Sequence, residues 1–314
     1  MADAFVVGNT TIVDTFAEAF GMSAARVIIT AATPYWAMTS AQSMTGFATS
    51  VIGCKTEAGI ERELTPEETM DGRPGVSVLL FSFDTEGVGK RLVERVGQCV
   101  LTCATTSCFN GLHGAAARKW TDVGGQLRFF GDGYQISKQL GERRFWRVPV
   151  MDGEFVVEEM FGVTKAVGGG NLIIMGRDLT ATLNATQAAV LAMRRLPDVI
   201  LPFPGGMVRS GSKVGSKYKF LSASTNQAYC PTLRGFAPST DVPDGVNCIL
   251  EIVVNGLSAG AIEAAMRDGI YAAAEAGATH ITAGNYGGKL GQFKFGLHEL
   301  LGQKQSAVPA AESA

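Results

Sequence analysis

The chain has 314 residues, of which 46% are hydrophobic and 18% are charged, and its formal net charge is -2. This composition excludes a disordered chain, which would be poorer in apolar residues and richer in charge. A net charge so close to zero excludes a molecule-wide field for nucleic acid or an anionic membrane, so we expect neither partner. The N-terminal stretch MADAFVVGNTTIVDTF lacks the basic and long apolar segments of a signal or an anchor, and we expect a cytoplasmic protein.

The first half of the chain alternates apolar runs with segments of helical periodicity. In chain order we expect a strand at 26–33, a helix at 34–47, strands at 49–54 and 76–83, a helix at 87–100 and a strand at 126–133. The resulting order is strand, helix, strand, strand, helix, strand. This is the order of a ferredoxin-like split βαβ unit.

The second half repeats this order. The expected elements are a strand at 169–177, a helix at 186–196, strands at 198–206 and 248–256, a helix at 259–277 and a strand at 280–288. We therefore predict an α+β fold of two ferredoxin-like lobes related by internal duplication. The predicted domains are a first lobe at 1–147, a second lobe at 148–302 with a long 203–245 insertion, and a mobile tail at 303–314.

One carboxylate interrupts the apolar strand CILEIVVNG at 248–256. Strand alternation places Glu251 on one face with Ile249, Val253 and Asn255, so this side chain is expected to be partly buried. Burial raises the pKa of a carboxyl group unless a cation compensates for it. The residues alone leave two alternatives open, a functional protonated acid and a structural ion pair with Lys or Arg.

Motifs for metal and nucleotide binding are absent from the sequence. The three histidines have neither metal-ligand nor catalytic-triad spacing, and the six cysteines form no CxxC pair, so we predict no metal site. Residues 206–213 read G-S-K where a P-loop requires G-K-S/T. The stretch VGGGN at 167–171 precedes a strand instead of following one, so it does not fit a dinucleotide fingerprint.

A long segment at 203–232 combines basic residues, hydroxyl groups and little apolar periodicity. Its positive charge suits the phosphate or carboxylate groups of a ligand, so Lys213 and Lys217 are candidate binding residues. A solvated surface loop would have the same composition, and the residues alone favour neither alternative. Four glycines at the ends of predicted strands could let a ligand approach the backbone, or could serve turn geometry alone: Gly131, Gly133, Gly287 and Gly288.

Several longer motifs together resemble the formylmethanofuran:tetrahydromethanopterin formyltransferases. They are DTFAEAF (14–20), ARVIITAA (25–32), EAGI (57–60), DGRPGV (71–76), FFGDGYQ (129–135), FPGG (203–206), SKVGSK (212–217), ASTN with AYCPT (223–232) and AGNYGGKLGQF (283–293). The resemblance covers nearly the whole chain. The first few residues, the stretch 104–124 and the tail depart from the archaeal pattern.

The resemblance implies an enzyme that moves a formyl group between the amine of methanofuran and N5 of tetrahydromethanopterin. These two, or a dephospho variant of the pterin, are coenzyme substrates, and no tightly bound cofactor is expected. The near-neutral charge looks like the methylotrophic bacterial branch, in which transfer runs toward formylmethanofuran during formaldehyde oxidation to formate. A homotetramer and hydrolase-type partner subunits are implied. The alternative is a binding subunit that presents a pterin or methanofuran to a partner hydrolase.

The resemblance also assigns the site. It implies that Glu251 is the catalytic residue, protonated in an apolar setting so that it donates a hydrogen bond to the developing oxyanion. Besides the two lysines and four glycines above, the substrate-binding residues expected from the matching motifs are Asp132, Tyr134, Phe203, Gly205, Gly206, Ser212, Ser216, Ser224, Thr225, Asn226, Asn255, Asn285, Tyr286 and Lys289.

Overall fold

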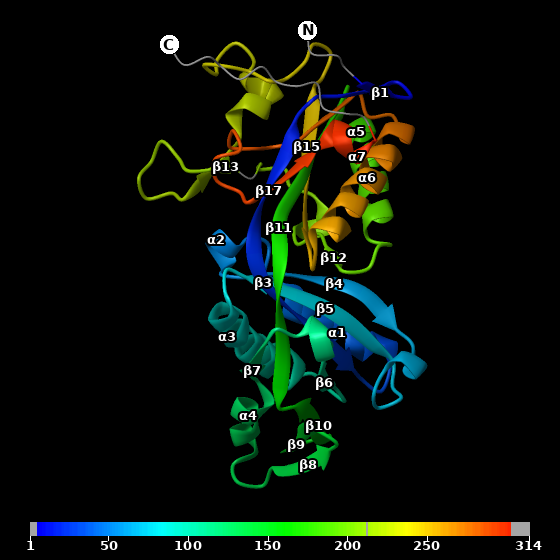
Figure 1. Cartoon of the computed structure of the whole chain (residues 1–314), viewed down its shortest axis with the longest axis vertical. Coiled ribbons are helices and arrows are strands. Elements are labelled where there is room, and N and C mark those ends of the chain that lie inside the picture. The colour runs from blue at the N-terminus through cyan, green and yellow to red at the C-terminus, as the bar shows by residue number, and fades with distance from the viewer. Residues whose placement is uncertain (1–4, 212, 303–314) are drawn as a thin grey trace.

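The computed structural model describes residues 5–211 and 213–302. Two long strands, β3 (Phe16–Thr30) and β11 (Met160–Gly176), run along the long axis of an elongated molecule (Figure 1). They pair antiparallel from Thr164 with Ala24 to Gly168 with Phe20, and so join the lower and upper parts of one large mixed sheet. The predicted mixture of helices and strands is confirmed.

The lower part is built on a first set of four antiparallel strands, ordered β6-β3-β5-β4. Besides β3, they are β4 (Glu57–Leu64), β5 (Gly75–Ser82) and β6 (Ser107–Asn110). The helices α1 (Pro34–Thr45) and α3 (Thr85–Arg95) supply apolar residues to the same core cluster as Val27, Val78 and Leu80 of the strands. The open face carries the polar side chains of Arg26 and Ser77, which alternate with these core residues.

The upper part repeats this pairing in a second set, ordered β16-β11-β15-β12. Besides β11, its strands are β12 (Val199–Ile200), β15 (Cys248–Gly256) and β16 (His280–Thr282). Helices α5 (Leu179–Met193) and α6 (Ala259–Glu275) pack on one face, over Leu172, Ile174 and Ile252. The opposite face is left for the insertion that follows β12.

Each of these four helices begins after a polar residue that caps it. Thr33, Asp84, Asp178 and Ser258 each accept a hydrogen bond from an N–H of the first turn. These bonds satisfy donors that have no partner within the helix, which explains why the helices begin where they do.

Shorter elements complete the chain. The strands are β1 (Phe5–Val7), β2 (Thr10–Ile12), β7 (Lys119–Asp122), β8 (Ile136–Leu140), β9 (Arg143–Val150), β10 (Gly153–Glu158), β13 (Lys213–Val214), β14 (Ala223–Ser224) and β17 (Phe293–Gly296). The short helices are α2 (Val51–Cys54), α4 (Gly124–Leu127) and α7 (Leu297–Leu300), with a π-helical turn at Val96–Val100. Strands β9 and β10 pair antiparallel as a hairpin.

Two predicted strands of the first half are wrong. Residues 126–133 fold into α4 and a 3-10 turn (Arg128–Gly131), with Phe129 and Phe130 each 66% exposed, so their apolar run does not enter a core. The fourth strand is β6 instead. Residues 49–54 contain helix α2 instead of a strand. The amide of Val51, the first residue of α2, donates to the carboxylate of Glu57, and strand β4 begins only at Glu57.

The strand predicted at 198–206 is limited to Val199–Ile200. Pro202 and Pro204 cannot donate to a ladder, and Pro204–Gly206 forms a 3-10 turn instead.

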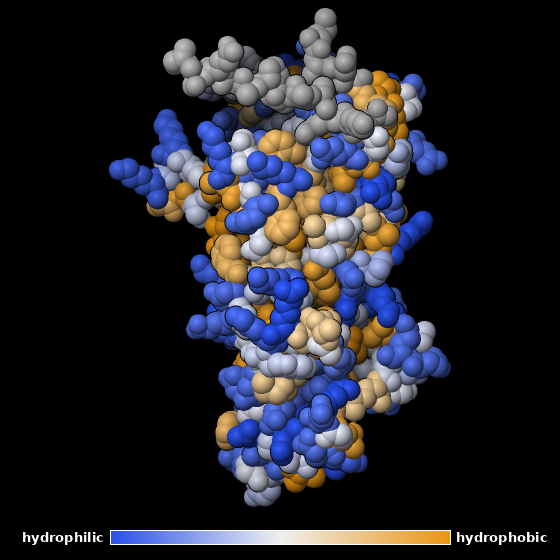
Figure 2. All heavy atoms as spheres, in the orientation of Figure 1, coloured by the Kyte–Doolittle hydropathy of each residue, from blue (hydrophilic) through white to orange (hydrophobic). Residues whose placement is uncertain are grey.

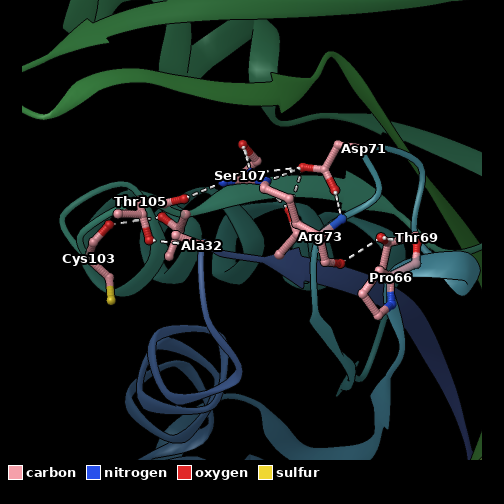
Figure 3. A network of polar contacts seen from close by, with 10 residues as sticks. Ala32, Pro66, Thr69, Asp71, Arg73, Cys103, Thr105 and Ser107 are labelled. Carbon is pink, nitrogen blue, oxygen red and sulfur yellow. Dashed lines mark hydrogen bonds and ion pairs between the residues drawn. The ribbon is translucent and has the colours of Figure 1, made fainter.

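The loop between β4 and β5 is held by the guanidinium of Arg73 (Figure 3). It donates to the Thr105 carbonyl at 2.6 Å, to Ser107 Oγ at 2.7 Å and to Asp71 Oδ2 at 2.8 Å. The network joins this loop to the turn before β6, so the DGRPG segment is fixed by side chains of the first set itself.

Candidate active site around Glu251

Glu251 lies on the face of the second set that faces away from α5 and α6. Glu251 pairs with Ile173 of β11 and is only 5% exposed. The backbone of Glu251 also exchanges two hydrogen bonds with Val208, at 2.7 and 3.0 Å. This bridge attaches the start of the insertion to the edge of β15 at the residue that carries the carboxylate. The burial predicted from strand alternation is therefore present.

The insertion covers this face with its own apolar residues. Val242 and Val246 pack with Ile173 and Met175 of β11. Arg234 clamps the far part of the insertion, because its Nη2 donates to the carbonyls of Pro243 at 2.9 Å and Val246 at 2.7 Å. The insertion is thus an ordered lid on the sheet, and Glu251 lies beneath it.

A cavity of about 40 Å³ lies beside the carboxylate. Its walls combine aliphatic groups with hydroxyl, amide and thiol groups. The lining residues are Ile173, Val208, Arg209, Ser210, Gly211, Thr225, Asn226, Tyr229, Cys230, Ile249 and Glu251. A small polar group fits a space of this size and chemistry.

Two tyrosines lie within electrostatic reach of Glu251. Burial raises the pKa of the Tyr229 phenol, and the carboxylates of Asp241 and Glu251 raise it further. A hydrogen bond with Thr282 lowers this pKa but does not cancel the rise. Burial and the charge of Glu251 likewise raise the pKa of Tyr286, which receives a hydrogen bond from the backbone of Val214. Both phenols are therefore protonated at neutral pH and can donate hydrogen bonds.

The structure brings part of the predicted site together. Thr225 and Asn226 line the cavity, and Tyr286 reaches the β13–β14 hairpin that leads into it. Lys213 of that hairpin donates to Gln227 Oε1 at 2.6 Å, next to the cavity wall. Further along the hairpin, Ser224 Oγ donates to the Gly215 carbonyl and Ser216 Oγ accepts the Tyr218 amide. Lys217 and Lys289 are exposed. Ser212 lies outside the described residues.

Other predicted residues lie elsewhere. Gly131, Asp132, Gly133 and Tyr134 follow α4 at the lower end of the molecule, which is mostly hydrophilic in Figure 2, whereas β15 is in the upper part. Within one chain they are not part of the Glu251 site.

The FPGG motif and Asn255 also lie away from the cavity. Phe203 and Gly205 line a separate groove of about 710 Å³ against β4, and Gly206 is buried against Val190. Asn255 is fully buried. It donates to Glu57 Oε2 at 2.5 Å and accepts the Gly169 amide at 2.9 Å, so both ends of its amide are occupied, which argues against the predicted substrate contact.

The loop at 283–292 is organised by a residue that the sequence reasoning did not select. Glu18 of β3 accepts four backbone N–H groups from this loop, and Asn285 Nδ2 donates to Thr15 Oγ1 and to the Phe16 carbonyl. Tyr229 was also missed. Signals existed for both: Glu18 is a charged residue flanked by the apolar residues of FAEAF, and Tyr229 is part of AYCPT.

The described residues contain no helix long and apolar enough to cross a membrane. Nor does this part of the chain contain a cluster of three or more His, Cys, Asp or Glu side chains that could hold a metal ion.

Comparison with protein families gives matches to both halves of the chain. Residues 5–150 match the family described as "Formylmethanofuran-tetrahydromethanopterin formyltransferase", and residues 153–300 match "FTR, proximal lobe". A relative with the first of these names from Methylobacillus flagellatus is 55% identical, over 94% of this chain and 99% of its own. A subunit of the formyltransferase/hydrolase complex from Methylorubrum extorquens is 50% identical, over 95% of this chain and 97% of its own.

Solved structures agree with these matches. A chain of the formyltransferase/hydrolase complex from Methylorubrum extorquens, determined with methylofuran, superposes with a TM-score of 0.91 at 48% identity, over 96% of this chain and all of that one. The formyltransferase from Methanosarcina barkeri gives a TM-score of 0.89 at 48% identity, over 94% of this chain and all of that one.

Proposed function

Because the chain belongs to the formylmethanofuran-tetrahydromethanopterin formyltransferase family, we propose that it transfers a formyl group between methanofuran and N5 of tetrahydromethanopterin. The observation that carries this proposal is 55% identity to a named formyltransferase over nearly the full length of both chains. The chain is thus an acyltransferase, and the two coenzymes are its substrates.

The reaction needs a small set of groups. The acceptor amine attacks the formyl carbon and gives up a proton, while the carbonyl oxygen gains negative charge. The carbonyl then re-forms as the bond from carbon to the donor nitrogen breaks, and that nitrogen takes a proton. We propose that Glu251, in its protonated form, donates a hydrogen bond to the developing oxyanion. Its 5% exposure and the aliphatic neighbours Ile173 and Ile249 support this role, because burial disfavours the charged form of a carboxyl group.

Substrate binding is proposed to involve the residues around the cavity. Thr225, Asn226 and Tyr286 can contact the coenzyme near the formyl group, and Lys213, Lys217 and Lys289 can attract acidic groups farther along it. We keep the other motif residues as proposals, except Asn255. For Gly131 to Tyr134, contact with this site would require a second copy of the chain.

The proposed partner subunits rest on the relatives. The relative from Methylorubrum extorquens belongs to a formyltransferase/hydrolase complex. By analogy we propose hydrolase-type partners. Transfer toward formylmethanofuran, a homotetrameric formyltransferase and a cytoplasmic location are proposals that rest on the motif resemblance alone.

We also propose that the fold is a duplication of a ferredoxin-like lobe, divided near residues 147 and 148. The shared strand order supports it: in both sets the first strand pairs with the third and fourth, and the second pairs with the third.

The test is an assay of the purified chain with formylmethanofuran and tetrahydromethanopterin, followed by the absorbance change of the pterin. Formation of formyl-tetrahydromethanopterin, lost in Glu251→Ala, is expected. Tight binding of either coenzyme without any conversion would instead favour a binding subunit that presents substrate to a hydrolase, and would refute the proposed activity.

A further inference from the structure

Glu18 lies in the middle of β3 and is only 1% exposed. Its Oε2 accepts the amides of Tyr286 at 2.7 Å and Gly288 at 2.9 Å, and its Oε1 accepts the amides of Leu290 at 2.6 Å and Gly291 at 2.5 Å. Burial alone would raise the pKa of this carboxyl group, but the four amides outweigh burial and hold the pKa at about 2. The side chain is therefore a permanent anion around which the loop is folded.

The loop can adopt this shape only because of its glycines. Gly288 has φ +70°, in the left-handed region. A Cβ on Gly291 would come within 2.5 Å of the Ala19 carbonyl oxygen and 2.6 Å of the Glu18 side chain. The backbone thus lies directly on β3, and the amides that could have bound an anionic substrate are already used by Glu18.

The same loop carries Tyr286 toward the Glu251 site. The Tyr286 ring packs on Phe20, with ring centroids 6.1 Å apart, and the Val214 backbone donates to its hydroxyl. Phe20 follows Glu18 by two residues, so both project from the same face of β3. One side chain holds the backbone of Tyr286 and the other supports its ring.

We propose that Glu18 is a positioning residue for formyl transfer, fixing the loop at 285–291 so that Tyr286 is held against Phe20 and the β13–β14 hairpin, within electrostatic reach of Glu251. The inference rests on the proposed function and adds a residue to it. It also assigns substrate contacts of this loop to side chains, such as those of Tyr286 and Lys289, because its amides at 286, 288, 290 and 291 bind Glu18.

The first measurement is amide hydrogen exchange in Glu18→Gln. A glutamine keeps one accepting oxygen but turns an NH₂ group toward two donors, so we expect exchange at 286–291 to accelerate by at least about tenfold. The matched control is Glu158→Gln. Glu158 is also buried and accepts hydrogen bonds from the Asn110 amide and from Nε and Nη2 of Arg143, but it lies in β10 at the lower end of the molecule. Its loss should leave exchange at 286–291 unchanged.

The second measurement is kcat, at a temperature well below the unfolding of every variant. We expect Glu18→Gln to lower kcat on the order of a hundredfold, because a displaced contact near the reacting group has that effect, while Glu158→Gln retains wild-type kcat. If Glu18 were merely structural, Glu18→Gln would lower thermal stability, as Glu158→Gln does, but both variants would retain wild-type kcat. That result would overturn the proposal. If Glu18→Gln does not fold, Gly291→Ala displaces the same loop and is expected to lower kcat similarly.

A double-mutant cycle with Tyr286→Phe then tests the route. If Glu18 acts through Tyr286, the double variant should be about as slow as the slower single variant. Multiplied losses, or wild-type kcat in Tyr286→Phe, would refute this route. Failure of the proposed function itself would be recognised differently, because the wild type and the Glu158→Gln control would then also transfer no formyl group while the exchange data remained interpretable.

Discussion

The carboxyl group of Glu251 has aliphatic side chains as its nearest neighbours on its face of the sheet. Ile173 is its partner across the strand pair and Ile249 lies two residues away on the same face. The apolar flanks visible in the sequence were sufficient to predict this burial. They could not show that Tyr229 and Val208 line the cavity together with Glu251, because these two residues come from the insertion and not from β15.

Two substitutions separate the catalytic role of Glu251 from a structural one. Glu251→Gln keeps a hydrogen-bond donor and Glu251→Ala keeps none, so kcat should fall about a hundredfold or more in the alanine variant and appreciably less in the glutamine variant. Thermal unfolding of the same proteins is the control. Variants that unfold at lower temperature but retain wild-type kcat would contradict the catalytic role and favour a structural pair.

Glu57 predicts how stability depends on pH. Burial raises the pKa of its carboxyl group, and the hydrogen bonds from Asn255 and Val51 only partly oppose this. The folded state therefore binds more protons than the unfolded state above the ordinary pKa of about 4.3. Stability contributed by Glu57 should be present below that pH and be lost as the pH rises through the folded pKa.

Glu57→Gln cannot ionise, so its free energy of unfolding, relative to that of the wild type, should increase with pH across this window and then level off. Urea unfolding at a series of pH values measures the difference. The stability that Glu18 contributes depends on pH in the opposite direction. Its pKa of about 2 lies below the unfolded value, so this contribution is lost as the pH falls through about 2. A difference for Glu57→Gln that is independent of pH would contradict the assignment.

At the scale of elements, the long periodic segments were predictable and the short ones were not. The strand at 248–256 has the predicted bounds, and the helix predicted at 259–277 ends at Glu275. The prediction failed at 126–133 and 49–54, where short apolar runs fold as helical turns because tertiary contacts decide their conformation. Strands β1 and β17 are only three and four residues long, too short for a periodicity to appear.

The β13–β14 hairpin places two lysines at the approach to the cavity. Lys213 is partly buried against Gln227 and Lys217 is exposed near the turn. If they attract acidic groups of a coenzyme, the double variant Lys213→Ala/Lys217→Ala should have a higher KM for at least one coenzyme, with little change in kcat, and a weaker dependence of KM on salt.

Steady-state kinetics at several ionic strengths measure this effect. Lys90→Ala/Lys119→Ala removes the same charge from exposed positions on α3 and β7 of the first half, and is expected to behave as the wild type. Equal behaviour of the two double variants would mean that the hairpin lysines are only solvated.

At the scale of the whole molecule, the two sets of strands are joined by polar contacts between residues far apart in sequence. Arg26 of β3 donates to Glu61 of β4 at 2.7 Å and to Asp198, just before β12, at 2.5 Å. The Asp198 amide donates to Glu61 as well, at 2.8 Å. Nearby, Asn255 and Glu57 link β15 to β4. No local pattern could predict this junction, because the partners that it joins across the two sets are separated by 137 or more residues.

Glu61 is the centre of the junction and gives the sharpest test of it. The Glu61 side chain is 3% exposed. Its carboxylate accepts hydrogen bonds from two N–H groups of Arg26, from the Asp198 amide and from the Ser77 hydroxyl. Glu61→Gln leaves the partly buried guanidinium of Arg26 with only part of its compensation. The free energy of unfolding should therefore fall by about 3 kcal/mol, the lower end for a broken buried pair, because Arg26 retains Asp198. Glu68→Gln removes an exposed partner of Arg62, with side chains 40% and 52% exposed, and should lower the free energy of unfolding much less. Urea unfolding measures the decrease in free energy of unfolding for both variants. A larger decrease in Glu61→Gln would support a junction that couples the two sets, whereas equally small decreases would show that Glu61 contributes no more than an exposed ion pair.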